Sequence, residues 1–235
     1  MFHITHWKAG SQWTHRIFHG LVYERLVLPK VGMGQFLLAP IQPGKVYPTL
    51  YVTKEQFDRV AIPANSRRFV VIRDLRDTLV SLYFSSKVSH VILTEHQRLL
   101  RRALEERNQE EGLLLLLERE LPFSADIQRS WLKSGESLLR YDDLLKDDVT
   151  ILENVLLRHC GLRVTPERFR DVVLANRFER VSGGRGLGEV DLGAHERQGL
   201  PGDWRNHYTE RVKRSFKDRY GDLLVATGYE RDSDW

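Results

Sequence analysis

Lys8, Gly10 and Ser11, near the start of the sequence, have types and a spacing that could bind an anion. They follow a short apolar segment, Phe2 to Ile4, that is typical of a strand, and Ser11 opens a helical pattern. Backbone N–H groups exposed at such a turn, the helix dipole and the Lys8 ammonium would together attract phosphate or sulfate. Taken alone, these residues fit an ordinary turn between strand and helix more often than an anion site. The pattern G-x-x-x-x-G-K-[ST] of nucleoside triphosphate loops is absent, because Lys8 precedes Gly10.

Arg73 belongs to the second stretch of the sequence whose residues could do chemistry. The run from Phe69 to Ile72 is continuously apolar, as in a parallel strand that is covered on both faces. Arg73 would then emerge at the carboxyl end of that strand, where open α/β sheets bind ligands. We expect a helix over 74–87, with Ser81 on roughly the face of Arg73 and Asp77. The alternative is a surface helix that carries Arg and Asp pairs.

The elements that must position these residues alternate between strand and helix. We expect strands near 2–6, 47–52, 69–72 and 137–141, with helices between and after them. This alternation predicts an α/β fold with a parallel central sheet flanked by helices, and it leaves the strand order open. With 235 residues and 41% hydrophobic residues, we expect a single domain over 1–235.

Helix boundaries have local signals. Thr53 with Gln56 resembles a capping box, and Thr165 followed by Pro166 predicts a helix start. Further helical patterns cover 94–120, 148–159 and 208–227, and we expect Gly112 to divide the first of these. Residues 28–63 are rich in Gly and Pro and predict loops with short extended pieces, and 182–202 cannot form a regular element.

Composition excludes several classes of protein. A net charge of +4 with acidic residues interspersed does not indicate a nucleic-acid binder, and a local cationic cleft fits better. One cysteine, Cys160, excludes an intrachain disulfide and a multi-cysteine zinc site, and fits a reducing compartment. No leader pattern stands at the start, and the apolar run from Leu113 to Leu117 is too short to span a bilayer. We therefore expect a cytoplasmic protein with no nucleic-acid or membrane partner.

Five motifs, in one order along the chain, resemble those of the cytosolic-type sulfotransferases, which use 3′-phosphoadenosine 5′-phosphosulfate (PAPS). They are Lys8-x-Gly10-Ser11-x-Trp13, Arg73 with Ser81, Leu138-Leu-Arg-Tyr141-Asp-Asp, Phe178-Glu-Arg-Val181, and Arg197-Gln-Gly199-Leu-Pro-Gly202-Asp-Trp-Arg-Asn206. The last of these is the most specific. Together the motifs span nearly the whole chain, so chance agreement is a poor explanation.

This resemblance implies a P-loop-like sulfotransferase fold, PAPS as co-substrate and no metal. It implies a role for each residue that matches a family motif. The 5′-phosphosulfate loop would be Lys8, Ala9, Gly10, Ser11, Gln12 and Trp13; the 3′-phosphate would be bound by Arg73, Ser81, Arg197, Gln198 and Gly199; adenine would be held by Trp13, Tyr141, Phe178 and Val181. Lys8 would stabilise charge on the leaving oxygen, and 182–202 would be a mobile lid over the nucleotide.

The family pattern breaks at three places. Gln198 stands where a lysine is usual, and Ala9 replaces a frequent serine. The segment from Tyr47 to Lys54 lacks the histidine of the usual catalytic strand, so the general base is unassigned. His90 and Glu55 are the two candidates: an imidazole titrates near neutral pH, whereas Glu55 would need burial to raise its pKa. Each is more often structural than catalytic.

The sequence therefore predicts a sulfotransferase that acts on a hydroxyl or amine of a small-molecule acceptor. Two other classes of function stay open. A kinase-like phosphoryl transferase would need a magnesium-binding carboxylate and a Gly-Lys-Ser/Thr loop, and the sequence lacks the latter. The absence of the usual catalytic histidine fits a noncatalytic adenine-nucleotide binding module. The sequence selects neither the acceptor nor the oligomeric state.

Overall fold

The computed structural model describes residues 1–28 and 34–235, and the chain forms two compact units. Unit 1 comprises Met1–Arg73 and Asp126–Arg177, and unit 2 comprises Asp74–Ala125 and Phe178–Trp235. The expectation that residues 1–235 act as one domain stays a prediction. Part of the loop-rich segment expected at 28–63 lies outside the described residues.

Unit 1 is built on a four-stranded sheet in the order β2-β1-β3-β4, and every pairing is parallel. The strands are β1 (Phe2–Thr5), β2 (Tyr47–Leu50), β3 (Arg68–Ile72) and β4 (Leu138–Arg140). All four residues of β1 are buried, as expected for a central strand that is covered on both faces. The α/β fold class and the parallel central sheet are thereby confirmed.

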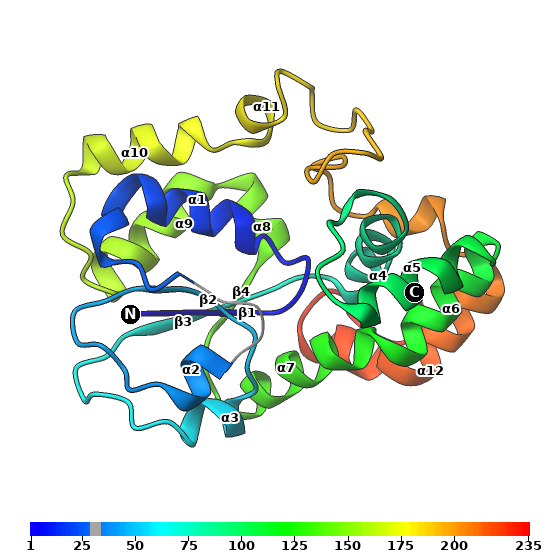
Figure 1. The fold of residues 1–235 in the computed structure, drawn as a ribbon, viewed down its shortest axis with the longest axis horizontal. Coiled ribbons are helices and arrows are strands. Elements are labelled where there is room, and N and C mark those ends of the chain that lie inside the picture. Colours follow the sequence, from blue (N-terminus) through cyan, green and yellow to red (C-terminus); the bar gives the residue numbers. More distant parts are fainter. Residues whose placement is uncertain (29–33) are drawn as a thin grey trace. The chain divides into compact units, whose positions relative to one another are not determined.

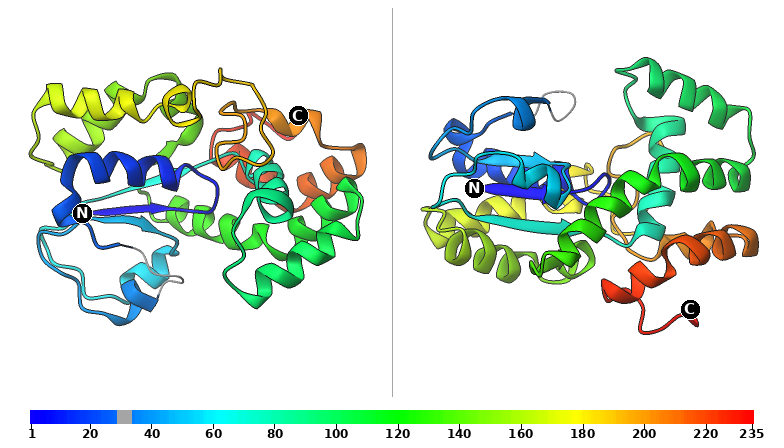
Figure 2. Two further views of the ribbon diagram at one scale, coloured as in Figure 1. Left: turned by 45° about the horizontal axis from the view of Figure 1, so that its top comes forward. Right: turned by 90° about the horizontal axis from the view of Figure 1, so that it is seen from below.

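Helices cover both faces of this sheet (Figures 1 and 2). One face carries α1 (Ser11–Val22), α8 (Tyr141–Lys146), α9 (Asp148–Leu152) and α10 (Pro166–Ala175). The other face carries α2 (Gly34–Leu38), α3 (Lys54–Asp58) and the later part of α7 (Leu121–Lys133). The core on the first face joins Ile17 and Phe18 of α1 to Phe69 of β3 and Phe169 of α10. The 3₁₀-helix η1 (Tyr23–Arg25) and the π-helix η3 (Glu153–His159), which continues α9, complete the unit.

Unit 2 is helical throughout its regular elements. It comprises α4 (Leu75–Phe84), η2 (Ser85–Ser89), α5 (Glu95–Glu105), α6 (Gln109–Arg119), the start of α7, α11 (Phe178–Val181), η4 (Asp203–Asn206) and α12 (Glu210–Ala226). Helix α6 packs against both α4 and α12. The expectation that Gly112 divides the helical region was wrong, because the break falls before the Asn108 cap and Gly112 lies inside α6. Gly112 serves packing there: a Cβ would lie 2.6 Å from Cε2 of Tyr83.

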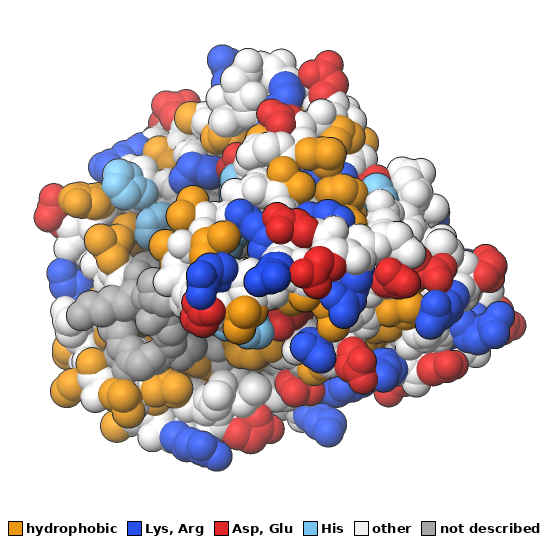
Figure 3. Space-filling view, turned by 45° about the vertical axis from the view of Figure 1, so that its right-hand side comes forward, with side chains coloured by type: hydrophobic (Ala, Val, Ile, Leu, Met, Phe, Trp, Pro, Cys, Tyr) orange, Lys and Arg blue, Asp and Glu red, His pale blue; other side chains and the backbone are white. Residues whose placement is uncertain are grey.

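The predicted helix starts and the predicted irregular segment agree with the structure. Thr53 and Gln56 form the expected capping box of α3, and the Thr165 side chain caps α10. Residues 182–202 contain no helix or strand. Among the described residues, no helix is long and apolar enough to cross a membrane. Figure 3 shows Lys and Arg side chains interspersed with Asp and Glu side chains over one face of the molecule.

Candidate functional site

The turn between β1 and α1 has an unusual backbone. Lys8 has a φ of 64° and Gly10 a φ of 84°, so two left-handed residues turn the chain from the strand into the helix. Gly10 is the N-cap of α1, no side chain caps the helix, and its first turn carries no acidic residue. The first N–H groups of α1 therefore lie at a turn that contains Lys8 and no carboxylate, and this arrangement suits an anion.

Gly10 also lies in close contact with an aromatic wall. A Cβ at this position would lie 2.6 Å from Cε2 of Tyr141, so only glycine fits. The Tyr141 ring meets the Trp13 ring edge to face, at 6.0 Å between centroids. The indole nitrogen of Trp13 is buried and has no hydrogen-bond partner among the described residues. This cradle and its unsatisfied donor fit a ligand that brings an aromatic ring and polar atoms.

Arg73 joins this cluster from the end of β3. Its Nη1 donates a hydrogen bond of 2.9 Å to the carbonyl of Lys8, and its guanidinium lies 5.1 Å from the centre of the Tyr141 ring. Unit 1 thus brings together Lys8, Gly10, Trp13, Arg73 and Tyr141, all of which the sequence assigned to donor binding. Ala9 and Ser11 are buried in the same turn, and Gln12 is exposed.

His6 and Gln128 support the turn through hydrogen bonds, and sequence reasoning did not find this role. Nε2 of His6 accepts the Arg73 backbone N–H at 3.0 Å and lies 2.8 Å from Nε2 of Gln128. The hydrogen-bond network therefore assigns the proton to Nδ1, which donates to the Trp7 carbonyl at 2.9 Å. Burial lowers the pKa of His6 to about 3, so the imidazole is neutral and supports the loop as a fixed hydrogen-bonding group.

Tyr51 and Glu55 lie after β2. The Tyr51 hydroxyl is 2.8 Å from Oγ of Ser11, a contact that no sequence motif signalled. Glu55 is exposed in the first turn of α3, and hydrogen bonds with its own backbone and with Thr53 lower its pKa. Glu55 therefore lacks the burial that a base near neutral pH would need.

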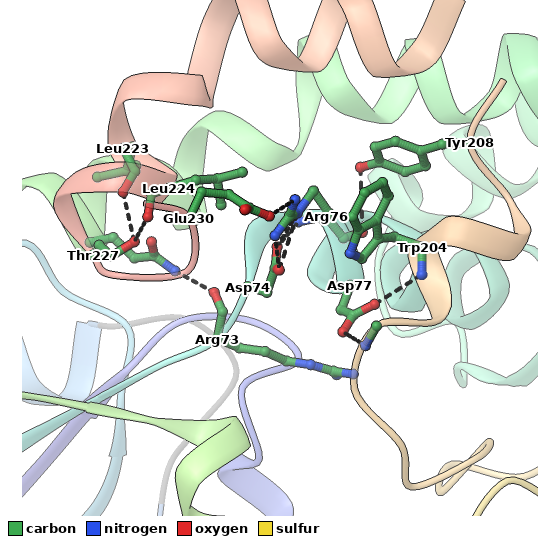
Figure 4. A network of polar contacts seen from close by, with 12 residues as sticks. Arg73, Asp74, Arg76, Asp77, Trp204, Tyr208, Leu223, Leu224, Thr227 and Glu230 are labelled. Atoms are coloured by element: carbon green, nitrogen blue, oxygen red, sulfur yellow. Dashed lines mark hydrogen bonds and ion pairs between the residues drawn. The ribbon is translucent and has the colours of Figure 1, made fainter. Parts of the chain in front are cut away.

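In unit 2, the Gly202-Asp-Trp204 motif is tied to the first turn of α4 (Figure 4). The buried carboxylate of Asp77 accepts the N–H groups of Gly202 at 2.6 Å and of Trp204 at 3.0 Å. The guanidinium of Arg76 lies between the rings of Trp204 and Trp235, at 4.2 and 4.5 Å from their centres, and forms ion pairs with Asp74 and Glu230. These contacts fix the motif rather than present it as a reacting group.

Arg197 is positioned by the same motif. Its Nη2 pairs with the Asp203 carboxylate, and its guanidinium lies 4.7 Å from the centre of the Phe84 ring. Burial would raise the pKa of Asp203, but hydrogen bonds from His207, Asn206 and Arg197 outweigh it and lower the pKa. Asp203 is therefore a carboxylate that holds Arg197 in one orientation.

Phe178 and Gly199 lie in contact in unit 2. Gly199 has a φ of 72°, and a Cβ there would lie 2.7 Å from Cδ2 of Phe178. Arg185 covers the Phe178 ring at 5.3 Å and donates to the carbonyls of Glu196 at 2.6 Å and Arg197 at 3.0 Å. Residues 182–202 are thus organised around one guanidinium although they form no regular element.

Four further residues of the expected site also lie in unit 2. Ser81 on α4 and Val181 on α11 are half-buried, and the Gln198 carbonyl accepts the Gly188 N–H at 2.8 Å. His90 is exposed at the end of η2, where its N–H donates to the Ser85 carbonyl at 2.8 Å. Within the described residues, no three His, Cys, Asp or Glu side chains come together as a metal site would need.

The fold and these clusters define an α/β protein with a turn suited to an anion at the carboxyl edge of a parallel sheet. Residues 60–228 match the family described as the sulfotransferase domain. Because this match covers more than half of the chain, the protein belongs to the sulfotransferase family, whose chemistry is sulfuryl transfer from PAPS. No curated protein matches the sequence at a significant level.

Solved structures with the same fold include mouse sulfotransferase SULT7A1 complexed with PAP, the desulfated product of PAPS. It has a TM-score of 0.67 and 16% identity, with 98% of this chain and 85% of that chain covered. Retinol dehydratase in complex with retinol and PAP has a TM-score of 0.59 and 15% identity, with 95% and 80% covered. The same enzyme with androsterone and inactive cofactor PAP has a TM-score of 0.59 and 16% identity. These similarities show that the chain has the sulfotransferase fold.

Proposed function

We propose that the protein transfers a sulfuryl group from PAPS to a hydroxyl or amine of a small-molecule acceptor. The observation that carries this proposal is the β1–α1 turn, where the uncapped start of α1 follows Lys8 and a left-handed Gly10. Membership of the sulfotransferase family and the PAP named in similar structures support the same co-substrate. The retinol and androsterone named with retinol dehydratase support a small organic acceptor.

In unit 1, the N–H groups from Gly10 to Trp13, with Ala9 and Gln12 in the same turn, would bind the 5′-phosphosulfate. Trp13 and Tyr141 would hold adenine, because their rings already form one wall. Arg73 would bind the 3′-phosphate, since a guanidinium is a planar, charged group that donates several hydrogen bonds, and the bond from Nη1 to the Lys8 carbonyl holds it at the turn.

In unit 2, Ser81, Arg197, Gln198 and Gly199 would contact the 3′-phosphate. Asp203 engages one nitrogen of Arg197 and leaves the guanidinium further donors for phosphate. Phe178 and Val181 would cover adenine, and residues 182–202 would act as a lid that orders over the nucleotide.

PAPS supplies the activated sulfuryl group. The protein's own work is to place the donor in line with the acceptor and to stabilise the charge that develops on the leaving phosphate oxygen. Lys8 is the residue we assign to that charge. His90 is retained as the candidate base, because Glu55 is exposed and its pKa is lowered.

Binding calorimetry tests the nucleotide first. PAP should bind with a dissociation constant of about micromolar, and ATP with magnesium should bind at least about 100-fold more weakly. Preference for ATP with magnesium would instead support the kinase-like phosphoryl transferase. The second measurement follows labelled sulfate from PAPS into a panel of phenols, alcohols and amines. Tight binding of PAP without transfer to any of them, and without release of sulfate to water, would identify a noncatalytic nucleotide-binding module.

A further inference from the structure

Tyr51 occupies a position from which it could act on the donor. It follows directly after β2, which pairs in parallel with β1 so that Leu50 lies opposite Ile4. Tyr51 therefore stands at the edge of the sheet at which β1 leads into the turn of Lys8 and Gly10. Parallel α/β sheets bind ligands outside this carboxyl edge.

A direct contact joins Tyr51 to the turn. Its hydroxyl lies 2.8 Å from Oγ of Ser11, 40 residues away in the sequence. Ser11 is the first residue of α1 and is itself buried. The hydrogen bond fixes a phenol beside the N–H groups that we assign to the 5′-phosphosulfate.

The chemistry of the pair favours Tyr51 as a donor. Each hydroxyl carries one proton and can accept two hydrogen bonds, so Ser11 can donate to Tyr51 while the phenolic proton is directed elsewhere. Burial raises the pKa of the Tyr51 hydroxyl, which therefore stays protonated near neutral pH and does not act as a base. The strand before it, Tyr47–Leu50, contains no histidine that could take this place.

We propose that Tyr51 is a catalytic residue whose hydroxyl donates a hydrogen bond to a sulfuryl oxygen of the donor during transfer. This inference rests on the proposed function. In the step, the acceptor oxygen or nitrogen forms a bond to sulfur, and the bond from sulfur to the phosphate oxygen breaks with its electron pair on the phosphate. The acceptor proton leaves to a base other than Tyr51. The phenol keeps its proton and stabilises charge on the group in flight.

The test compares Tyr51→Phe with Tyr47→Phe. Both remove one phenolic hydroxyl from the same stretch of chain, but the Tyr47 hydroxyl accepts a hydrogen bond from the Gln42 N–H. Turnover is measured as transfer of the labelled sulfuryl group from PAPS to nitrophenol as the acceptor probe, and as release of labelled sulfate with water alone. Binding is measured by calorimetry with PAP, and folding by thermal unfolding.

Tyr51→Phe should lower kcat about 10- to 100-fold, while the KM for PAPS and the affinity for PAP change less than about threefold. This factor should be constant from about pH 6 to pH 9, since the phenol does not titrate there. Tyr51→His, which restores a hydrogen-bond donor, should recover part of the loss, whereas a merely structural role would show no such rescue. Tyr47→Phe should keep its turnover.

Two results would overturn the inference. One is a Tyr51→Phe variant whose kcat equals that of Tyr47→Phe. The other is a loss of PAP affinity that accounts for the whole effect on turnover, which would make Tyr51 a binding residue. Should Tyr51→Phe fail to fold, a folded Tyr51→His with less than about a hundredth of the turnover would count against hydrogen-bond donation as the role. Failure of the proposed function is seen separately, because the unaltered protein would then bind no PAP and release no sulfate.

Discussion

The helices α1 and α10 of unit 1 begin in opposite ways. Helix α10 is closed by its own sequence: the Thr165 side chain accepts the Arg168 N–H at 3.3 Å, and Pro166 and Glu167 follow in the first turn. Helix α1 begins at a left-handed Gly10 with no side-chain cap and no acidic residue in its first turn. A helix start whose N–H groups are accepted by a capping side chain stabilises the fold. A helix start whose N–H groups have no side-chain cap suits an anion from outside.

Most helices among the described residues resemble α10 in this respect. Side chains cap α3, α4, α5, α6, α9 and α12, the capping residues being Thr53, Asp74, Thr94, Asn108, Asp147 and Thr209. A side-chain cap contributes about 1 kcal/mol to stability. The start of α1 forgoes this contribution at the place where Lys8, Arg73 and Tyr141 meet. Helix α8 also has no side-chain cap, but its first turn contains Asp142 and Asp143, whereas the first turn of α1 contains no acidic residue. This combination distinguishes the turn that we assign to the anion.

Among the changes that test this comparison, replacement of Lys8 should have the largest effect, and that effect should be on turnover. Lys8→Ala removes the positive charge that we assign to the leaving oxygen, so kcat should fall about 100- to 1000-fold, with a smaller loss of PAP affinity. The measurement is steady-state transfer of the labelled sulfuryl group from PAPS to nitrophenol. Lys146→Ala is the control, because Lys146 is an exposed lysine of unit 1 that pairs with Asp143, and it should leave kcat unchanged. Equal turnover in the two variants would remove Lys8 from the mechanism.

Acid should weaken the turn before α1 through two buried histidines. Desolvation lowers the pKa of His3 to about 4 and that of His6 to about 3, so both are neutral in the folded protein. The unfolded chain binds these protons below about pH 6.5, and stability should therefore fall as the pH drops from that value toward the folded pKa. At about pH 5.5 the expected loss is about 1.4 kcal/mol for each histidine relative to pH 7.5.

Urea unfolding at the two pH values measures this loss. The His6→Gln variant should show a smaller pH dependence, whereas His19→Gln should keep it, since His19 is exposed. Hydrogen exchange should show that acid opens residues 6–14 before the start of α10, where no buried histidine lies. An unchanged free energy of unfolding between the two pH values would contradict the neutral state assigned to His6.

The features that the sequence predicted depend on neighbours in the chain. The Thr53 and Thr165 caps were readable because the capping side chain and its partner are three residues apart. The central strand Arg68–Ile72 was readable from its apolar run, and Arg73 then followed by position. The prediction for Gly112 was wrong, because the sequence does not distinguish a glycine that leaves room for the Tyr83 ring from a glycine that ends a helix.

The features that the sequence did not predict depend on contacts between distant residues. Tyr51 meets Ser11 across 40 residues, and Gln128 meets His6 across 122. No spacing rule connects such pairs, since the sheet order that brings them together is itself absent from the sequence pattern. The motifs located the turn that we assign to the donor, and only the fold identified the groups that support this turn.

A methyl group at Gly10 tests how far the start of α1 depends on glycine. In Gly10→Ala the new Cβ would lie 2.6 Å from the Tyr141 ring and the backbone would be strained at a φ of 84°. We expect a loss of stability of about 2 kcal/mol and an affinity for PAP lowered about 10- to 100-fold. Gly135→Ala is the matched control, since Gly135 has a φ of 75° and nothing within 4 Å. It should lose about 1 kcal/mol and keep its affinity, and equal affinities in both variants would contradict the cradle.

Removal of the cap of α10 should have the smallest effect of these changes, and that effect should be on stability alone. Thr165→Ala leaves the Arg168 N–H without its acceptor, so the free energy of unfolding should fall by about 1 kcal/mol, and Thr165→Ser should restore most of it. Denaturant unfolding measures the loss, and calorimetry with PAP should show no change in affinity. Because a capped helix start serves stability alone, a change of affinity in Thr165→Ala would remove the distinction between α1 and α10. An unchanged affinity beside the losses in Lys8→Ala and Gly10→Ala would assign the anion to one helix start in unit 1.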